Sequence, residues 1–430
     1  MQNCKSANFP WRNMDIPAPA AYRLVMSDLP RARLLDRQTP PHILTLILLA
    51  GISTLAMNIF LPSLPGMTAY FDTEYRLMQL SVAVYLAVNA VFQLVIGPVS
   101  DRLGRRPVIL GGMAVFLLAT VGCALSTTVW VFLFFRMMQA GIVAAMVLSR
   151  AIVRDIVPER QAASMIGYVT MGMAVVPMIG PAIGGALDAL FGWQAVFWAL
   201  LVLGALVTWL AWADLGETAP LQGQSFREQV ADYPELFLSP RFWGYAMSAA
   251  LSSGAFFAYL GGAPFVGAQV FGMDPATLGL FFGAPAIGYF LGNFLSGRFS
   301  VRIGVNRMVL WGTIVNAAGL SLNLALFYAG LGSPLSFFGL MTFMGLGNGM
   351  TIPNATAGAL SVRPHVAGTA SGLAGALMIG GGAALSALAG ALLVPGSGAF
   401  PLLWIMVSTA LAGIGAITLV ILRERRLARI

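Results

Sequence analysis

The sequence has few charged residues and little cysteine. Only 9% of its 430 residues are charged, two are cysteines and 58% are hydrophobic, whereas a soluble globular domain carries about 25% charged residues. This shortage of charge excludes a cytosolic enzyme, a secreted disulfide scaffold and a disordered regulator. Cys4 lies in a polar leader and Cys123 in an apolar run, so we expect no disulfide framework. The composition indicates a protein whose main solvent is lipid.

The signatures of several kinds of chemistry are also missing. The sequence has no Gly-x-x-x-x-Gly-Lys-Ser/Thr phosphate loop, so we do not expect ATP to drive the protein directly. It has two histidines, and no group of His, Cys or carboxylate residues has the spacing of metal ligands. Paired carboxylates, or a nucleophile and a base at one membrane depth, are absent too. We therefore expect no enzyme activity, no metal and no cofactor.

Long uncharged segments account for most of the chain. A helix needs about 20 apolar residues to cross a hydrocarbon core of about 30 Å, and cutting the chain at its charges and turn signals predicts twelve such helices. Their expected bounds are 43–65, 77–99, 108–126, 129–152, 163–190, 194–213, 242–269, 277–297, 308–329, 335–358, 368–393 and 400–422. The predicted fold class is an all-α membrane protein with 12 transmembrane helices.

One sizeable hydrophilic loop divides these helices into two sets of six. We expect a cytoplasmic, disordered leader over 1–42, a six-helix bundle over 43–214, a cytoplasmic linker over 215–241, a second six-helix bundle over 242–422 and a cytoplasmic tail over 423–430. The leader lacks the apolar core of a cleavable signal, so the first span is expected to act as an uncleaved one. Met26 begins a more compact leader, which leaves open whether residues 1–25 are translated.

The positions of the basic residues predict the orientation. With both termini in the cytoplasm, 22 of the 24 Lys and Arg residues fall in cytoplasmic segments, as the positive-inside rule requires. The formal charge of +8 is thus a topology signal, and nucleic acid is not expected as a partner. We expect a monomeric, multi-pass protein in the lipid bilayer of the cell inner membrane.

The loop after the second span combines glycines with a dense group of charges. One carboxylate among three arginines makes a salt-bridge cluster that can form or break, and the alternative is a loop that only anchors the chain by its positive charge. The spacing Gly-x-x-x-Asp-Arg-x-Gly-Arg-Arg resembles the major facilitator superfamily of transporters. The resemblance implies a fold of two six-helix bundles and a cytoplasmic gate formed by Gly97, Asp101, Arg102, Gly104, Arg105 and Arg106.

A weaker copy of this loop follows the eighth span. There Gly292, Gly297, Arg298, Gly304 and Arg307 take the equivalent places, and an internal repeat of this kind is typical of two-bundle transporters with a site at the midplane. Because Gly297 stands in place of the aspartate, we expect the second loop not to use the same ion pair.

The fourth span contains Arg136, the only charged residue well inside any predicted span. A charge in hydrocarbon costs about 3 kcal/mol on insertion scales, so this side chain should face the protein interior or an aqueous cavity. Arg136 and Gln139 resemble the family motif Arg-x-x-Gln-Gly, with Ala140 where glycine is usual. The resemblance implies a role in a substrate or proton site, and the alternative is a structural arginine bonded to backbone carbonyls.

The fifth span contains a run of glycine and proline. Proline removes an amide donor and glycine allows close helix packing, so we expect a kinked and tightly packed helix. The run Gly-Pro-x-x-Gly-Gly, formed by Gly180, Pro181, Gly184 and Gly185, resembles the motif that marks antiporters of this family, drug exporters especially. The resemblance therefore implies export.

Further matches narrow the resemblance to the Bcr/CflA branch of bicyclomycin and chloramphenicol exporters. They include Leu61-Pro62-Ser63-Leu64-Pro65 in the first span, Arg150 to Asp155 after the fourth, and Pro353-Asn354-Ala355 in the tenth. Asn58 stands where that branch usually has aspartate. The resemblance implies substrate or coupling roles for Asn58 and Asn354.

The missing aspartate affects the expected coupling. A proton-driven exchanger usually needs a buried carboxylate with a raised pKa, and none of the 16 acidic residues lies in the middle of a predicted span. Arginine does not deprotonate in proteins, so Arg136 cannot replace it. Asp155 is the remaining candidate, unless it only pairs with Arg154 or Arg102.

The predicted function is efflux of small amphipathic drugs, such as phenicols or bicyclomycin, by alternating access in exchange for protons. A uniporter or symporter for a small, anionic metabolite is the alternative, favoured by the missing carboxylate and by the uncompensated charge of Arg136. A membrane sensor that kept the fold and lost transport is a third, which the intact first gate motif disfavours.

Overall fold

The computed structural model describes residues 32–156, 165, 169, 176, 179–218, 234–363 and 367–427. Every regular element in these ranges is helical. Residues 32–218 are called the first half below, and residues 234–427 the second half. Most of the predicted linker, and residues 1–31 of the predicted leader, lie outside the described residues.

The first half begins with a broken helix and continues through long helices. Its elements are α2 (Ile43–Asn58), the 3-10 turn η2 (Leu61–Ser63), α3 (Leu64–Tyr70), α4 (Tyr75–Leu103), α5 (Arg105–Ala124), α6 (Val129–Met138), the 3-10 turn η3 (Gln139–Ile142), α7 (Val143–Ile156), a helix Ile179–Phe191 and α9 (Trp193–Asp214). Pro62 and Pro65 lie at the starts of η2 and α3, because proline fits the first helical turn but not the interior.

The second half follows the same order of long helices. Its elements are α11 (Pro240–Phe265), the π-helical turn η4 (Val266–Val270), α12 (Pro275–Phe281), α13 (Ala284–Ile303), α14 (Val305–Tyr328), α15 (Pro334–Ser361), α16 (Ala367–Leu392) and α17 (Phe400–Leu427). The helix α17 therefore continues through most of the predicted tail.

The described part of the chain contains 11 helical segments that are long and apolar enough to cross a membrane. Each matches one predicted span. The remaining prediction, 163–190, lies largely outside the described residues, which include its end as the helix Ile179–Phe191. The predicted all-α membrane fold is confirmed.

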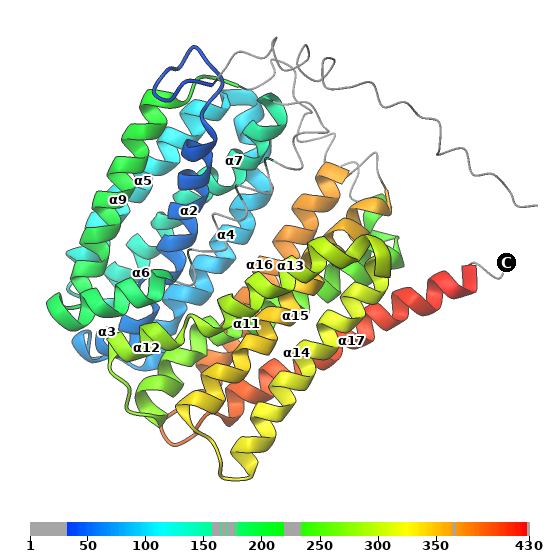
Figure 1. The fold of residues 1–430 in the computed structure, drawn as a ribbon. Coiled ribbons are helices and arrows are strands. Elements are labelled where there is room, and N and C mark those ends of the chain that lie inside the picture. Colours follow the sequence, from blue (N-terminus) through cyan, green and yellow to red (C-terminus); the bar gives the residue numbers. More distant parts are fainter. Residues whose placement is uncertain are drawn as a thin grey trace, which may run out of the picture.

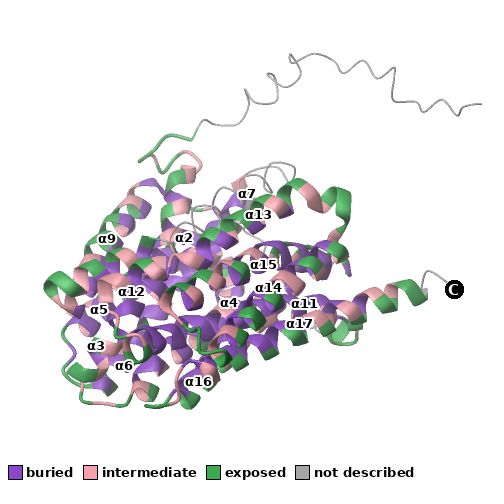
Figure 2. Cartoon of the chain, turned by 60° about the horizontal axis from the view of Figure 1, so that its bottom comes forward, coloured by how far each residue is buried: buried purple, intermediate pink, exposed green. Residues whose placement is uncertain are grey.

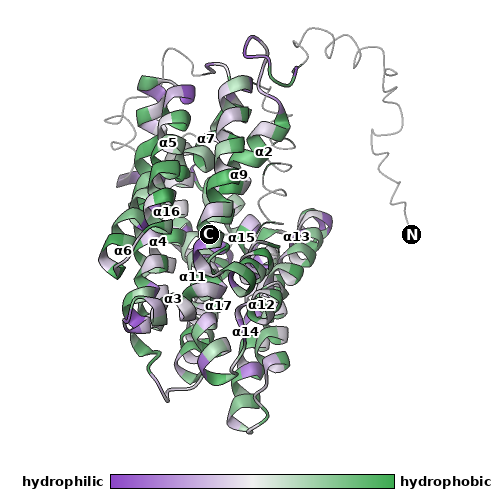
Figure 3. Cartoon of the chain, turned by 90° about the vertical axis from the view of Figure 1, so that its left-hand side faces the viewer, coloured by the Kyte–Doolittle hydropathy of each residue, from purple (hydrophilic) through white to green (hydrophobic). Residues whose placement is uncertain are grey.

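The two halves form two groups of helices that meet along a shared face (Figure 1). Within the second half α15 packs on α13 and α14, and between the halves α4 packs on α16 and contacts α11. Large apolar side chains, including Trp130, Leu206 and Leu419, are exposed along the helices. Figure 2 shows buried residues on the faces that helices share, and Figure 3 shows hydrophobic residues on the outside. This pattern is the reverse of a soluble protein's surface and suits lipid.

The same backbone turn occurs in both halves. Gly104 ends α4 and precedes α5 with φ +95° and ψ 154°, and Gly304 ends α13 and precedes α14 with φ +89° and ψ 148°. A positive φ of this size strains any residue with a Cβ, so glycine is required at both places. The internal repeat seen in the sequence is therefore also a repeat of conformation.

The end of the predicted leader has a fixed structure, which corrects the expectation of disorder over 32–42. Asp214, which is fully buried at the end of α9, accepts hydrogen bonds from the backbone N–H of Leu35 at 2.8 Å and of His42 at 2.9 Å. Its second oxygen also accepts from Thr45 Oγ1 at 2.7 Å, and the Arg37 guanidinium lies 4.0 Å from the centre of the Trp212 ring. One carboxylate thus holds this segment against the first half.

Candidate functional site

The helices place the charged loops at one end of the molecule. Arg102, Arg302 and Arg425 lie in the last turns of α4, α13 and α17, and this end is called the arginine-rich end. The opposite end, called the distal end, contains the connections 71–74, 271–274 and 393–399.

Arg105 is the centre of the predicted gate. Arg105 is only 7% exposed. Its guanidinium forms ion pairs with Asp101, four residues earlier, and with Asp155 of α7. The Asp155 Oδ2 lies 3.1 Å from the Arg105 Nε. Arg105 also donates to Ser100 Oγ. A buried guanidinium with two carboxylates is satisfied in both charge and geometry. The structure therefore joins Asp101 and Asp155, which we predicted separately, through one arginine.

Asp155 pairs with Arg105, an arginine that the sequence analysis did not suggest for it. We expected Arg102 or Arg154, and the side chain of Arg154 lies outside the described residues. Arg105 reaches Asp155 because α7 packs against α5. Burial raises the pKa of the Asp155 carboxyl above its ordinary value, while the hydrogen bond and charge of Arg105 oppose the rise.

Glu217, which the sequence analysis missed, completes this cluster. Its carboxylate accepts hydrogen bonds from the backbone N–H of Arg105 at 2.7 Å and of Arg106 at 3.2 Å. These are the first two amides of α5, which have no partner within the helix, and a negative charge there is favoured by the helix dipole. The one available signal was an acid directly after the sixth span.

The other predicted gate residues have smaller roles in this arrangement. Arg102 is exposed, and Arg106 donates through Nη2 to the Trp212 carbonyl at 3.3 Å. Gly97 has open space where a Cβ would lie, so its freedom from a side chain is not required by packing here. Gly104, in contrast, lies against the Glu217 carboxylate, which a Cβ would overlap.

The second half has an acid in a comparable place, on a different element. Glu424 of α17 accepts a hydrogen bond from Arg241 Nη2 at 2.6 Å and another from Asn306 Nδ2 at the start of α14. Glu217 likewise follows the last helix of the first half and binds the start of α5. The matching turns at Gly104 and Gly304 also correct one prediction. They place Gly297 opposite Gly97 and Val301 opposite Asp101, so the residue that replaces the aspartate is Val301 and not Gly297.

Arg136 lies between two aromatic rings. It is 1% exposed, and its guanidinium carbon is 4.2 Å from the centres of both the Phe60 and the Tyr85 ring. Its Nε donates to the Ser81 carbonyl at 3.3 Å, and its Nη1 donates to Gln139 Oε1 at 2.7 Å. Two ring faces and two acceptors offset much of the cost of burying this charge.

Gln139 extends this site to a third helix. Its Nε2 donates to Thr120 Oγ1 of α5 at 2.8 Å, so Arg136 and Gln139 link α4, η3 and α5. One nitrogen of the guanidinium, Nη2, has no hydrogen-bond partner among the described residues. Both alternatives for Arg136 therefore retain support. The bond to the Ser81 carbonyl favours a structural arginine, and the buried Nη2 without a partner favours a role in a substrate site.

Asn58 and Asn354 lie in separate places and are not joined to Arg136 by any hydrogen bond in the described part. Asn58 Nδ2 donates to the Thr54 carbonyl at 2.8 Å, while its buried Oδ1 has no partner among the described residues. Asn354 Nδ2 donates to Ser296 Oγ at 2.7 Å, which links α15 to α13. Among the described residues, hydrogen bonds and ion pairs therefore place the five predicted substrate or coupling residues in four sets: Asn58, Arg136 with Gln139, Asp155 and Asn354.

The glycines of the fifth span contact both halves. A Cβ on Gly184 would overlap the carbonyl oxygen of Ile59 in the first half, and a Cβ on Gly185 would overlap the carbonyl oxygen of Pro275 at the start of α12. Gly279 of α12 makes the reciprocal approach to the Pro181 carbonyl. Gly180 lies near Leu55. Adjacent glycines therefore seat one helix against α2 on one side and α12 on the other.

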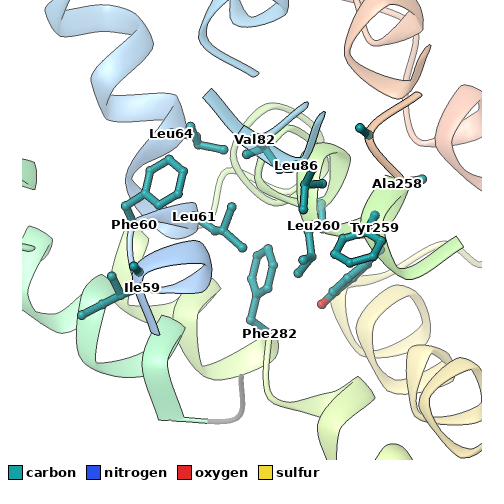
Figure 4. Close-up of a cluster of buried hydrophobic side chains, with 14 of the residues drawn as sticks. Ile59, Phe60, Leu61, Leu64, Val82, Leu86, Ala258, Tyr259, Leu260 and Phe282 are labelled. Carbon is teal, nitrogen blue, oxygen red and sulfur yellow. The ribbon is translucent and has the colours of Figure 1, made fainter. Parts of the chain in front are cut away.

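The halves also meet in an apolar cluster. Buried residues of the first half, including Phe60, Leu61 and Val82, belong to the same cluster as Tyr259 and Phe282 of the second half. Figure 4 shows these side chains together. Hydrogen bonds between the halves occur near the distal end, where Tyr75 OH donates to the Gly261 carbonyl at 2.7 Å. The ion pairs of the arginine-rich end described above each lie within one half.

Comparison with known proteins agrees with this geometry. The Major Facilitator Superfamily model matches residues 46–383. The chain is 33% identical over 323 residues to a chloramphenicol resistance protein of Pseudomonas aeruginosa, which covers 74% of this chain and 76% of the relative. It is 31% identical over 360 residues to multidrug resistance protein D of Escherichia coli strain K12, covering 80% and 88%. A solved D-xylose-proton symporter has a TM-score of 0.69 at 16% identity, covering 87% of this chain and 96% of that one.

Proposed function

This chain belongs to the Major Facilitator Superfamily and is a multi-pass membrane transporter rather than an enzyme, and we propose that it exports small amphipathic drugs in exchange for protons. Phenicols and bicyclomycin are the proposed substrate class. The drug resistance named for two relatives supports export, and so does the glycine and proline run of the fifth span.

The observation that carries the proposal is the packing of Gly185 against Pro275 and of Gly279 against Pro181, between the two halves. Alternating access needs two halves that stay in contact while they rotate against each other. Two facing helices that both carry glycine at the contact provide this, because their backbones can slide past each other without separating interdigitated side chains. The paired approaches of Gly185 to Pro275 and of Gly279 to Pro181 suit this movement.

The proposed orientation places the arginine-rich end and both termini in the cytoplasm, in the inner membrane. The basic loops support it through the positive-inside rule. Asp101, Arg105 and their neighbours then form a cytoplasmic gate, whose ion pairs lie within the first half here. Contacts between the halves near the distal end fit a conformation that is closed on the outside.

Asp155 is the proposed proton carrier. It is the acid whose pKa is raised by burial in the gate cluster, so it takes up a proton more readily than an ordinary carboxyl. Protonation would release Arg105 from one of its two carboxylates. Asn58, with one buried oxygen that has no partner in the described structure, is proposed as a substrate contact.

A uniporter or symporter for a small anionic metabolite is the second candidate. The Nη2 of Arg136 has no hydrogen-bond partner among the described residues. This favours the second candidate, because a buried guanidinium donor suits an acidic group. In this case Arg136 would bind the substrate directly, and no proton would need to move.

Everted membrane vesicles distinguish the two. Vesicles energised to an inside-acid gradient are given phenicols, other antibiotics, lipophilic cations and organic acids while the lumenal pH is followed. A drug exporter in exchange for protons releases protons when its substrate is added, and Asp101→Asn and empty-vector vesicles do not. If labelled substrate crosses without a pH response, proton exchange is wrong and the uniporter takes its place.

A further inference from the structure

Gln79 crosses from one half of the protein to the other. It lies one turn into α4 from the distal end and is fully buried. Its Nε2 donates to the Ser386 carbonyl at 2.6 Å and lies 2.7 Å from Ser386 Oγ. Ser386 belongs to α16 and is itself fully buried, so this contact joins residues 307 positions apart.

The second half forms a socket around the Gln79 amide. A Cβ on Gly261 of α11 would overlap Nε2, and a Cβ on Gly390 of α16 would overlap Oε1. One turn before Gln79 on α4, Tyr75 donates to the carbonyl of the same Gly261. Two glycines and one serine thus provide the shape and the acceptors for a single glutamine.

The hydrogen bonding of this amide is unequal. The NH₂ group has acceptors in Ser386, but the buried Oε1 has no partner in the part of the chain that the structure describes. In such an amide the hydrogen bonds of the NH₂ group stabilise the contact, while the buried oxygen without a donor destabilises it. Such a contact holds two halves together without locking them, as a transporter that must reopen requires.

A hollow of about 850 Å³ borders this contact at the distal end. It is lined by Asp72, Thr73, Glu74, Arg76, Leu77, Leu80, Ala387 and Ala391. Leu77 and Leu80 flank Gln79 on α4, while Ala387 and Ala391 follow Ser386 and Gly390 on α16. The hollow and the contact therefore lie along the same stretches of α4 and α16.

We propose that Gln79 is a positioning residue that latches the distal end closed, and that the hollow is the outer vestibule which joins the transport path when the latch opens. The proposal rests on alternating access, but not on the identity of the substrate. It assigns to Gln79, Ser386, Gly261 and Gly390 a shared role that none of the sequence motifs indicates.

A cysteine one helical turn from Gln79, farther from the distal end, can show whether the distal end is open. Ala83 lies one helical turn beyond Gln79 on the same face of α4 and is 3% exposed. In a chain with Cys4→Ser and Cys123→Ala, the Ala83→Cys thiol is labelled with a membrane-impermeant maleimide in right-side-out and in everted vesicles. The labelling rate from the distal side measures how often the latch is open, without any substrate.

Gln79→Leu should raise this labelling rate by about threefold to tenfold, which corresponds to the loss of about one net hydrogen bond. Gly390→Ala should do the same, because its methyl group displaces the Gln79 amide. Gln93→Leu is the matched control. Gln93 lies on the same helix and beside Gly375 of α16, but its amide donates within α4, to Asn89, so among the described residues the change removes no hydrogen bond between the halves and should leave the rate unchanged. In a Gln79→Ala background, Gly390→Ala should add nothing, because the space has been vacated.

Equal labelling of Gln79→Leu and the parent chain would overturn the latch, as would full additivity of Gly390→Ala and Gln79→Ala. If Gln79→Leu fails to fold, its Ala83→Cys thiol will also be labelled faster in detergent. The Gly390→Ala variants then test the latch independently. If labelling rises as expected while no drug is exported, the latch stands and the proposed substrate class is wrong.

Discussion

Alanine at two adjacent glycines should have two different effects. Gly184→Ala meets the backbone of Ile59 within the first half, whereas Gly185→Ala meets the backbone of Pro275 in the second half. The first change should weaken the first half in every conformation. The second should oppose only the conformation in which the helix Ile179–Phe191 touches α12.

The size of the effect follows from the distances. A Cβ at Gly184 would lie 2.8 Å from the Ile59 carbonyl carbon, and one at Gly185 would lie 2.9 Å from the Pro275 carbonyl carbon, against an ordinary contact of 3.4 Å or more. The carbonyl oxygens of Ile59 and Pro275 would lie closer still to these Cβ atoms. Each helix must therefore shift by about an ångström or more, and overpacking of this kind costs about 1–3 kcal/mol. For Gly185→Ala this lowers the ratio of distally closed to open protein about 5- to 150-fold.

Two measurements separate the variants. Thermal unfolding in detergent should show a loss of stability for Gly184→Ala. The Ala83→Cys labelling rate from the distal side should rise for Gly185→Ala. Gly415→Ala is the control, because Gly415 lies in α17 with open space where its Cβ would be, and alanine in a helix is better than glycine by up to about 1 kcal/mol.

The reasoning would be refuted by Gly185→Ala with wild-type distal labelling, since its methyl group would then have displaced nothing between the halves. It would be refuted equally by Gly184→Ala that is as stable as Gly415→Ala. Identical behaviour of the two adjacent variants would mean that the helix contacts only one partner.

Three further predictions follow from single side chains. Arg136→Lys keeps the charge but loses the contact with two ring faces and the bond to Gln139, so unfolding in detergent should become easier by about 3 kcal/mol; an unchanged melting temperature with altered export would make Arg136 a substrate ligand instead. Because the pKa of Asp155 is raised in the folded protein, its contribution to stability is full below the ordinary value and is lost as pH rises through the raised value. Asp155→Asn should remove that slope from melting curves, and a retained slope would assign it to another group. Asp214→Asn keeps one acceptor oxygen of two and should lower the unfolding free energy by about 1.5–3 kcal/mol; wild-type stability would show that the segment 32–42 is held by other contacts.

The twelve spans could be predicted because each is a local decision. A segment in hydrocarbon must satisfy its own backbone hydrogen bonds, so length and lack of charge are enough to define a helix. Eleven predicted spans match helices within a few residues at each end. The glycines at 104 and 304 were visible for the same reason, since a positive φ is a property of one residue.

The partners of the side chains depended on how the helices pack. Asp155 binds Arg105, 50 positions away, and Glu217 reaches amides more than 100 positions away. The two faces of the Arg136 guanidinium are covered by Phe60, from the turn between α2 and η2, and by Tyr85 of α4. No periodicity within a helix encodes these choices, because they are set by the angle and depth at which one helix meets another.

The sequence by itself determined the fold class, the helices, the charged loop and the glycine run, since lipid and backbone geometry impose those features locally. Only the tertiary structure decided which residues are bonded to which. It joined Arg136 to Gln139 and Asp155 to Arg105, anchored residues 32–42 through Asp214, and brought Gln79 to Ser386 across 307 positions. The physical reason is that a polar side chain in a membrane protein takes whichever partner the packing brings within about 3 Å, and distance along the chain does not limit that choice.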